Sequence, residues 1–281
     1  MSIENDFTPT INITDEEMRS IQDAIMQRYG IDFHNYEPKS FKRRIQRIYR
    51  KFGFQSSFDL WSRALKDKDF VHDFINEVSV GLTSLFRNPE FWQTFKTLCE
   101  LQFSKTYPLH VWHAGCSSGE EIYTTAIVWD ELGYTRRVKS LATDISSSAL
   151  EQAQSGKINR AKLPEYERNL KSYNPKISLS QYFSETEKEV TFKPEHLRHV
   201  TFRNSNLIME DYGNEQYNII FCRNVLIYFD GPAKAKVIEK IYQSLKPGGF
   251  LIVGFLDSML SYLDESKFEY FDLSNRIFRK L

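Results

Sequence analysis

The amino-acid sequence predicts a small all-α N-terminal domain, residues 1–90, followed by a doubly wound, mostly parallel α/β domain over residues 91–281. Two observations predict this fold class. Up to about residue 90, apolar residues recur at helical spacing and no strand-like alternation interrupts them. After Pro108, short apolar runs alternate with helical stretches. That alternation is typical of a parallel sheet with helices on both faces.

The helical domain carries start and stop signals of its own. Thr14 and Glu17 have the spacing of a capping box, which predicts that a helix begins there. A second helix is predicted by one apolar stripe at positions i, i+4, i+7 and i+11, formed by Phe41, Ile45, Ile48 and Phe52. Gly53 follows directly and is expected to end this helix.

The α/β domain contains four short strand candidates, at residues 109–114, 139–144, 217–222 and 250–254. Helices are predicted between them, at residues 120–132, 147–155 and 232–245. Residues 180–205 break the alternation with three short β segments, of which the last begins at His199. We expect a small antiparallel insertion there.

Composition excludes several classes of protein. Lys+Arg and Asp+Glu both number 37, so no global field attracts nucleic acid or an anionic membrane. No apolar run reaches the roughly 20 residues of a membrane span, and the acidic N-terminus lacks a signal-peptide pattern. Three cysteines without close pairing predict reduced thiols in a cytoplasm. The pair His196 and His199 is read as polar surface, and no metal site is expected.

The loop Gly115–Gly119 follows the first strand candidate, and Glu120 and Glu121 begin the next helix. Glycine suits a sharp strand-to-helix turn and a close approach of backbone to ligand. The spacing is not that of a dinucleotide fingerprint, and two carboxylates at a helix start repel phosphate. They suit a cationic ligand such as S-adenosylmethionine, which has a sulfonium and an ammonium. A purely structural turn is the alternative interpretation.

Further candidate residues follow other strands. Asp144 ends the second strand, where an acid can accept both ribose hydroxyls; an ordinary helix cap is the alternative. Asn206 can meet an adenine edge through a paired donor and acceptor, with Leu207 packed on the ring. The run from Phe221 to Phe229 leaves the strand that begins at Tyr217.

These residues resemble the chemotaxis receptor glutamate methyltransferases of the CheR type, over nearly the whole chain. The resemblance is carried by the runs LTSLFR at 82–87, AGCSSGEE at 114–121, ATDI at 142–145, NL at 206–207, FCRNVLIYFD at 221–230 and LKPGG at 245–249. It implies a class I, Rossmann-like methyltransferase that binds S-adenosylmethionine and releases S-adenosylhomocysteine.

The resemblance also implies roles for individual residues. Arg87 and Tyr228 are placed near the acceptor carboxylate, and Arg87 also closes over the cofactor with Thr83. A carboxylate of the Glu120–Glu121 pair, with Glu121 preferred, binds the methionine end. The remaining cofactor-binding positions are Gly81, Gly115, Asp144, Asn206, Leu207, Asn224 and Val225.

The sequence departs from the family pattern at three places. Gly81 stands where asparagine is usual, so one cofactor contact is in doubt, and Leu85 replaces a common phenylalanine. The family's Gly-His-Ser-Glu reads Gly254-Phe-Leu-Asp257 here, close to the acceptor side. The insertion's first loop, 184–189, is short and lacks glycine, as in members that do not tether a receptor peptide.

The implied reaction is methyl transfer to glutamate side chains of chemotaxis receptors, giving methyl esters. The implied partner surface is the basic helix Lys39–Lys51, which would face acidic receptor helices. A merely solvated helix face is the main alternative, and nucleic acid is a less favoured one because no interleaved aromatic residues support base stacking. We expect a cytoplasmic monomer. Three other functions stay open: a methyltransferase for another protein or a small molecule, a non-catalytic S-adenosylmethionine-binding module, and, least favoured, a nicotinamide-dependent oxidoreductase.

Overall fold

The computed structural model describes residues 13–29, 31–78, 83–103, 108–255, 257 and 260–281. The chain forms two compact units. The helical unit comprises Met1–Val80 together with the later segment Tyr228–Ala233, and the α/β unit comprises Gly81–Ile227 and Lys234–Leu281. The later segment therefore packs with residues far from it in sequence.

The described part of residues 1–80 forms helices α1 (Asp15–Tyr29), α2 (Pro38–Phe52), α3 (Ser57–Lys66) and α4 (Lys68–Val78). The predicted capping box is confirmed: Glu17 N donates to Thr14 Oγ1 over 3.2 Å, and Thr14 N donates to Glu17 Oε2 over 2.8 Å. Gly53 ends α2 in the left-handed conformation, at φ +70°, and its N–H donates to Tyr49 O. Local hydrogen bonds therefore set the start of α1 and the end of α2, as predicted.

The core of the helical unit is built on the apolar stripe of α2. Phe41, Ile45 and Ile48 are fully buried. Phe33 lies between α1 and α2 in the sequence, and its ring contacts those of Phe41 and Phe74 at centroid distances of 5.8 and 5.7 Å. Each such buried side chain contributes about 1.5–3 kcal/mol. Tertiary packing of this stripe stabilises helices of this length more than propensity does.

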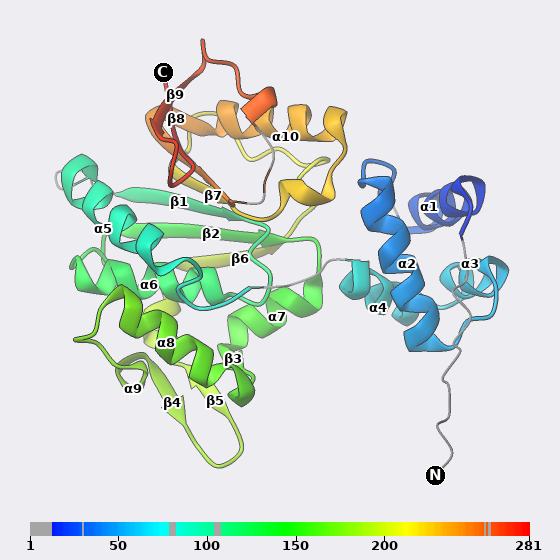
Figure 1. Ribbon diagram of the computed structural model, residues 1–281, viewed down its shortest axis with the longest axis horizontal. Helices are drawn as coiled ribbons and strands as arrows, with labels where there is room; N and C mark the ends of the chain where they lie inside the picture. Colours follow the sequence, from blue (N-terminus) through cyan, green and yellow to red (C-terminus); the bar gives the residue numbers. More distant parts are fainter. Residues whose placement is uncertain (1–12, 30, 79–82, 104–107, 256, 258–259) are drawn as a thin grey trace. The chain divides into compact units, whose positions relative to one another are not determined.

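A seven-stranded sheet forms the centre of the α/β unit, in the order β6-β2-β1-β7-β8-β10-β9. The strands are β1 (Leu109–Ala114), β2 (Val138–Asp144), β6 (Val200–Asn204), β7 (Tyr217–Cys222), β8 (Leu245–Val253), β9 (Phe268–Asp272) and β10 (Ile277–Lys280). Strands β6 to β8 in that order are parallel, whereas β10 is antiparallel to both β8 and β9. Helices cover both faces of the sheet (Figure 1). The predicted fold class is confirmed.

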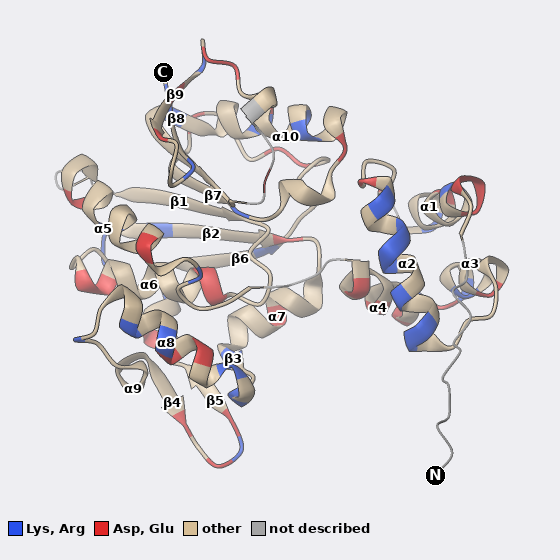
Figure 2. Cartoon of the chain, viewed as in Figure 1, with Lys and Arg blue, Asp and Glu red and all other residues tan. Residues whose placement is uncertain are grey.

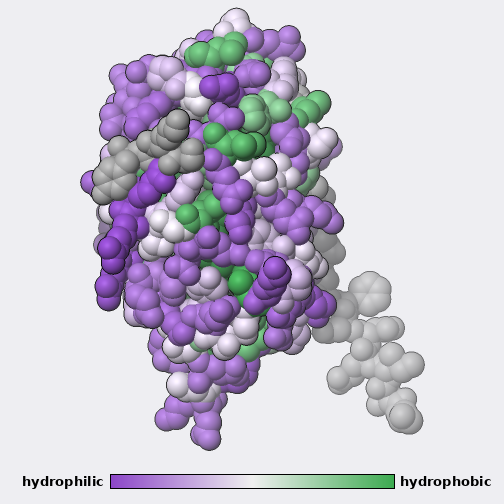
Figure 3. All heavy atoms as spheres, turned by 90° about the vertical axis from the view of Figure 1, so that its left-hand side faces the viewer, coloured by the Kyte–Doolittle hydropathy of each residue, from purple (hydrophilic) through white to green (hydrophobic). Residues whose placement is uncertain are grey.

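The longer helices of this unit are α5 (Pro89–Phe103), α6 (Glu120–Glu131), α7 (Ser147–Ser155), α8 (Leu163–Tyr173) and α10 (Gly231–Ser244), and α9 (Leu179–Tyr182) is one turn. Short 3₁₀ turns occur at 160–162, 194–197, 226–228 and 260–262. Trp92 of α5, Trp129 of α6 and Phe221 of β7 are fully buried together in the core. The face of this unit drawn in Figure 3 is mainly hydrophilic, with small separate apolar patches.

The predicted antiparallel insertion is present as a three-stranded sheet in the order β3-β5-β4, made of β3 (Lys157–Ile158), β4 (Phe183–Glu185) and β5 (Val190–Phe192). Its composition differs from the expectation in one strand. The segment after His199 is β6, which pairs in parallel with β2 at the edge of the main sheet. Short β segments reveal no partner in sequence, because strand pairing is a non-local contact.

Candidate active site

The carboxyl ends of the parallel strands bring the predicted residues to one edge of the main sheet. Strand β1 pairs with β2 on one side and with β7 on the other. Gly115, Asp144 and Arg223 stand at or directly after the ends of these three strands. In open α/β sheets, ligands bind at this edge, where neighbouring connections diverge.

The glycine loop requires a glycine at position 115, because a side chain there would collide with Val225. Gly115 has φ +76°, and a Cβ atom there would lie 2.5 Å from Cγ2 of Val225. The N–H groups of Gly115 and Cys116 both donate to Thr143 O over 2.9 Å. The loop is therefore fastened to β2 and packed against the turn after β7, so two predicted cofactor residues, Gly115 and Val225, lie in contact.

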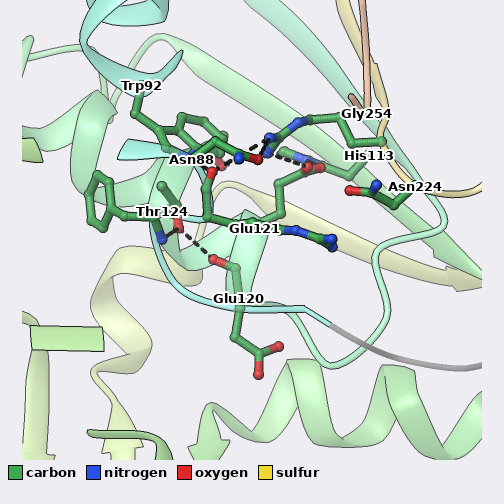
Figure 4. A network of polar contacts seen from close by, with 12 residues as sticks. Asn88, Trp92, His113, Glu120, Glu121, Thr124, Asn224 and Gly254 are labelled. Atoms are coloured by element: carbon green, nitrogen blue, oxygen red, sulfur yellow. Dashed lines mark hydrogen bonds and ion pairs between the residues drawn. The ribbon is translucent and has the colours of Figure 1, made fainter. Parts of the chain in front are cut away.

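The two glutamates at the start of α6 point in different directions, and Figure 4 shows Glu120 turned away from His113 and Asn88. The Glu120 side chain is 1% exposed. Its Oε1 accepts from Lys162 Nζ over 2.8 Å and from Tyr166 OH over 2.7 Å. Burial, and next the Glu120 charge, raises the pKa of Tyr166. The negative charge of Glu120 is thus balanced within the protein by the Lys162 ammonium.

Glu121 lies at the carboxyl edge of the sheet, and its carboxylate points toward His113 (Figure 4). Its side chain is 16% exposed. One oxygen, Oε1, is 3.2 Å from Nδ1 of His113, and the other, Oε2, is 3.4 Å from Nη1 of Arg223. Each carboxylate oxygen has a second lone pair. Of the two glutamates, Glu121 is therefore the better suited to accept from a ligand ammonium.

Asp144 holds the end of β2 next to the glycine loop. Its Oδ2 accepts from Ser117 N over 2.8 Å and its Oδ1 from Ser146 N over 2.9 Å. Burial raises the pKa of Asp144, and these two N–H groups partly oppose that rise. Each oxygen of Asp144 can accept one more hydrogen bond, so the carboxylate could accept from a pair of vicinal hydroxyls, one to each oxygen.

Asn206 and Leu207 follow β6. Oδ1 of Asn206 accepts from the N–H groups of Ile208 and Met209 over 3.0 and 3.3 Å. This differs from the expectation that the amide supplies both a donor and an acceptor to an adenine edge, because the turn already uses the acceptor. The amide nitrogen keeps its donor function toward a ligand. Leu207 is 9% exposed, as a side chain packed beneath a ring would be.

The turn after β7 is capped by a residue that lies more than 30 positions later. Asp257 is buried, and its Oδ2 accepts from the N–H groups of Asn224 over 2.6 Å and Gly254 over 2.9 Å. Its Oδ1 accepts from Ile227 N over 3.1 Å. Burial raises the pKa of Asp257, against the effect of these N–H groups. The last residue of the unusual 254–257 segment therefore shapes the turn that carries Asn224 and Val225.

The segment that carries Thr83 and Arg87 is fastened by helix α6 and by Lys162, the residue directly before α8. Thr83 O lies 3.5 Å from Lys162 Nζ, the same ammonium that binds Glu120. Phe86 N donates to Thr124 Oγ1 of α6 over 2.9 Å. The Arg87 side chain is partly exposed beside this anchored backbone. Gly81 lies outside the described residues.

Tyr228 belongs to the helical unit. Its ring stacks on that of Tyr36 at a centroid distance of 5.8 Å, and the guanidinium carbon of Arg44 lies 5.8 Å from the ring centroid. Its carbonyl accepts from Glu37 N over 2.9 Å. The role of Tyr228 near an acceptor stays a prediction.

Sequence reasoning did not assign Lys162, Arg223, His113 or the capping role of Asp257. Only Arg223 carried a local signal, since it adjoins Asn224 in the motif after β7. The others act across more than 30 residues or through a buried partner. Among the described residues, no group of three or more His, Cys, Asp and Glu side chains could hold a metal ion. No helix in the described part of the chain is long and apolar enough to cross a membrane.

A mostly parallel seven-stranded sheet with antiparallel last strands, and with acidic residues after β1 and β2, is the arrangement of a class I S-adenosylmethionine-dependent methyltransferase. Comparison with protein families agrees and is more specific. The SAM-binding domain of CheR methyltransferases matches residues 81–275, and their all-alpha domain matches residues 16–79. The chain therefore belongs to the CheR methyltransferase family, and the cofactor and enzyme class expected from the sequence are confirmed.

Individual relatives match over almost their whole length. Cher3 of Pseudomonas putida is 30% identical over 268 residues, which cover 95% of this chain and 97% of that protein. The chemotaxis protein methyltransferase of Listeria innocua is 30% identical over 86% of this chain and 89% of its own length. Chemotaxis protein methyltransferase 1 of Vibrio cholerae is 30% identical over 96% and 98%.

Proposed function

We propose that this enzyme transfers a methyl group to glutamate side chains of chemotaxis receptors, forming glutamate methyl esters. The observation that carries the proposal is the grouping of two carboxylates at the carboxyl edge of the sheet, Glu121 and Asp144, with the anchored Arg87 segment in one unit. Relatives that are named chemotaxis protein methyltransferases support the choice of acceptor.

The residues of the site fit S-adenosylmethionine. Glu121 would accept from the ammonium and Asp144 from the ribose hydroxyls, while two carboxylates near the loop disfavour a phosphate-bearing cofactor. When bound, S-adenosylmethionine supplies a methyl group activated by the positive sulfur. The hydrogen-bond acceptors of the site, and not only the family resemblance, therefore favour this cofactor.

The chain's own task is then to orient the acceptor. A glutamate side chain, with an ordinary pKa near 4.3, is already ionised at neutral pH and requires no general base. Arg87 would bind this carboxylate through charge-assisted hydrogen bonds and hold one oxygen toward the methyl group. Alignment of this kind and exclusion of water supply the rate enhancement.

The receptor would approach along α2 of the helical unit. Figure 2 shows Lys and Arg positions, in blue, along this helix. Three of its cations are paired within the unit, Lys42 with Asp15 over 2.8 Å, and Arg47 and Lys51 both with Glu77, over 3.0 and 2.5 Å. Lys39, Arg43 and Arg50 are exposed and would face acidic receptor helices. Binding would then weaken with rising salt, since exposed charges are screened.

We place this activity in the cytoplasm. All three cysteines of the chain are free and buried, which suits a reducing compartment. The modified receptor segments would have to be exposed on the same side of the membrane.

The test is transfer of radiolabelled methyl from S-adenosylmethionine to membranes that contain the host's chemoreceptors. Arg87→Ala is expected to reduce base-labile label about 100-fold or more. Asp144→Ala is expected to weaken S-adenosylhomocysteine binding about 10- to 100-fold, the effect of losing charge-assisted hydrogen bonds. The exposed Arg136→Ala, before the amino end of β2, is the control and should retain full labelling. Cofactor binding without any label in the wild type would mean another acceptor.

A further inference from the structure

Arg223 leaves the end of β7 and is buried among three segments of the α/β unit. Its side chain is 4% exposed. The guanidinium donates to Glu121 Oε2 over 3.4 Å, to Asn88 Oδ1 over 3.2 Å and to Arg87 O over 3.5 Å. It also lies over the rings of Phe91 and Trp92, 4.5 and 5.3 Å from their centroids. One side chain thus joins β7, helix α6 and the turn that carries Arg87.

The charge of this guanidinium is balanced locally. Burial lowers the pKa of Arg223, the Glu121 carboxylate raises it, and the nearby Arg87 lowers it. Because an arginine stays protonated in proteins, the buried cation needs a counter-ion. Glu121 fills that role, so its carboxylate is held in place by the residue that it neutralises.

The turn beneath Arg223 has a conformation that needs support. Phe86 and Asn88 have φ values of +48° and +61°, a left-handed region that residues other than glycine rarely adopt. Such residues cost free energy and persist where surrounding contacts determine them. The carbonyl between them, Arg87 O, accepts from both Arg223 and Trp92 Nε1, the latter over 3.0 Å. These contacts set the direction in which the Arg87 side chain leaves the backbone.

We propose that Arg223 is a positioning residue that couples the two halves of the site: it orients Glu121 toward the cofactor and the backbone of Arg87 toward the acceptor. The inference rests on the proposed function for its acceptor half, whereas its cofactor half does not. Lysine cannot replace the arginine, because a single ammonium lacks the planar fork that reaches three acceptors at once.

The central variant is Arg223→Lys, with Arg137→Lys as its control. Arg137 also donates to a backbone carbonyl, Phe103 O over 2.7 Å, and lies 4.3 Å from the ring centroid of Tyr134. It stands just before the amino end of β2, away from the site edge. We expect Arg223→Lys to weaken S-adenosylhomocysteine binding about tenfold and to lower kcat/KM for the acceptor about 100-fold. Arg137→Lys should change neither value, even if it lowers Tm.

Asn88→Gly isolates the acceptor half. Glycine keeps the left-handed backbone and removes the side chain whose oxygen Arg223 binds. We expect a raised acceptor KM with unchanged S-adenosylhomocysteine affinity. Arg223→Ala supplies a second readout, because added guanidinium at millimolar concentration should recover part of the cofactor affinity by occupying the space left by the side chain.

The outcomes separate the inference from the proposed function. Equal cofactor affinity and equal kcat/KM in Arg223→Lys and Arg137→Lys would overturn the inference and leave Arg223 as a stabilising residue only. If Arg223→Lys weakens cofactor binding and the wild type labels no receptor, the coupling of Arg223 to Glu121 is supported and the proposed acceptor is rejected.

Discussion

His199 should make the α/β unit sensitive to acid. The residue directly precedes β6, and its carbonyl accepts from Ser140 N over 2.8 Å. Both ring nitrogens are buried, and within the described residues neither has a hydrogen-bond partner. Burial, followed by the nearby His113 and His196, lowers the pKa of His199 from 6.5 to about 4. The ring is therefore buried in its neutral form.

The sign and size of the effect follow from proton linkage. A histidine whose pKa is lowered by folding contributes stability that is present above pH 6.5 and is lost as the pH falls toward 4. With these two values the loss is about 2 kcal/mol at pH 5 and about 3 kcal/mol at pH 4. For a unit of this size, 2 kcal/mol corresponds to a decrease in Tm of about 4–8 °C.

The assay compares Tm at pH 7.5 and pH 5.0 for the wild type and for His199→Leu, which removes the titrating ring. The variant should lose about 4–8 °C less than the wild type on acidification. His72→Gln, a change at an exposed histidine of the helical unit, should follow the wild type. If His199→Leu loses as much Tm as the wild type, His199 is not the buried neutral group and the reasoning fails.

Two further predictions concern the turns at the site edge. Gly115→Ala adds a methyl group 2.5 Å from Val225 Cγ2, whereas Gly133→Ala, at a similar φ of +69°, meets nothing within 4 Å. The control should cost about 1 kcal/mol of stability, and Gly115→Ala should cost about 1–3 kcal/mol more and weaken S-adenosylhomocysteine binding in calorimetry; equal losses would contradict the packing argument. Asp257→Ala leaves three backbone N–H groups without their acceptor and should lower stability by about 3 kcal/mol in thermal unfolding. Asp264→Ala, at an exposed carboxylate, should scarcely change Tm, and a similar Tm for both variants would argue against the capping role.

Part of this protein could be predicted because the controlling contacts are local. Thr14 and Glu17 are one helical turn apart, and Gly53 ends α2 through a hydrogen bond to Tyr49, so neighbouring residues determine these features. The alternation of strands and helices implied a parallel sheet, and such a sheet brings the residues after β1, β2 and β7 to one edge. The fold class and the general position of the site followed from those patterns.

Strand pairing and buried charges depended on the tertiary structure. The segment after His199 was expected to be part of the insertion, yet it pairs with β2. The sequence could not show this, because the backbone hydrogen bonds between strands do not depend on which side chains the strands carry. Asp257 caps a turn 30 residues earlier, and Lys162 joins Glu120 to the carbonyl of Thr83. A buried ion or N–H group must find its partner wherever the chain brings one near, and only the folded chain decides which residue that is.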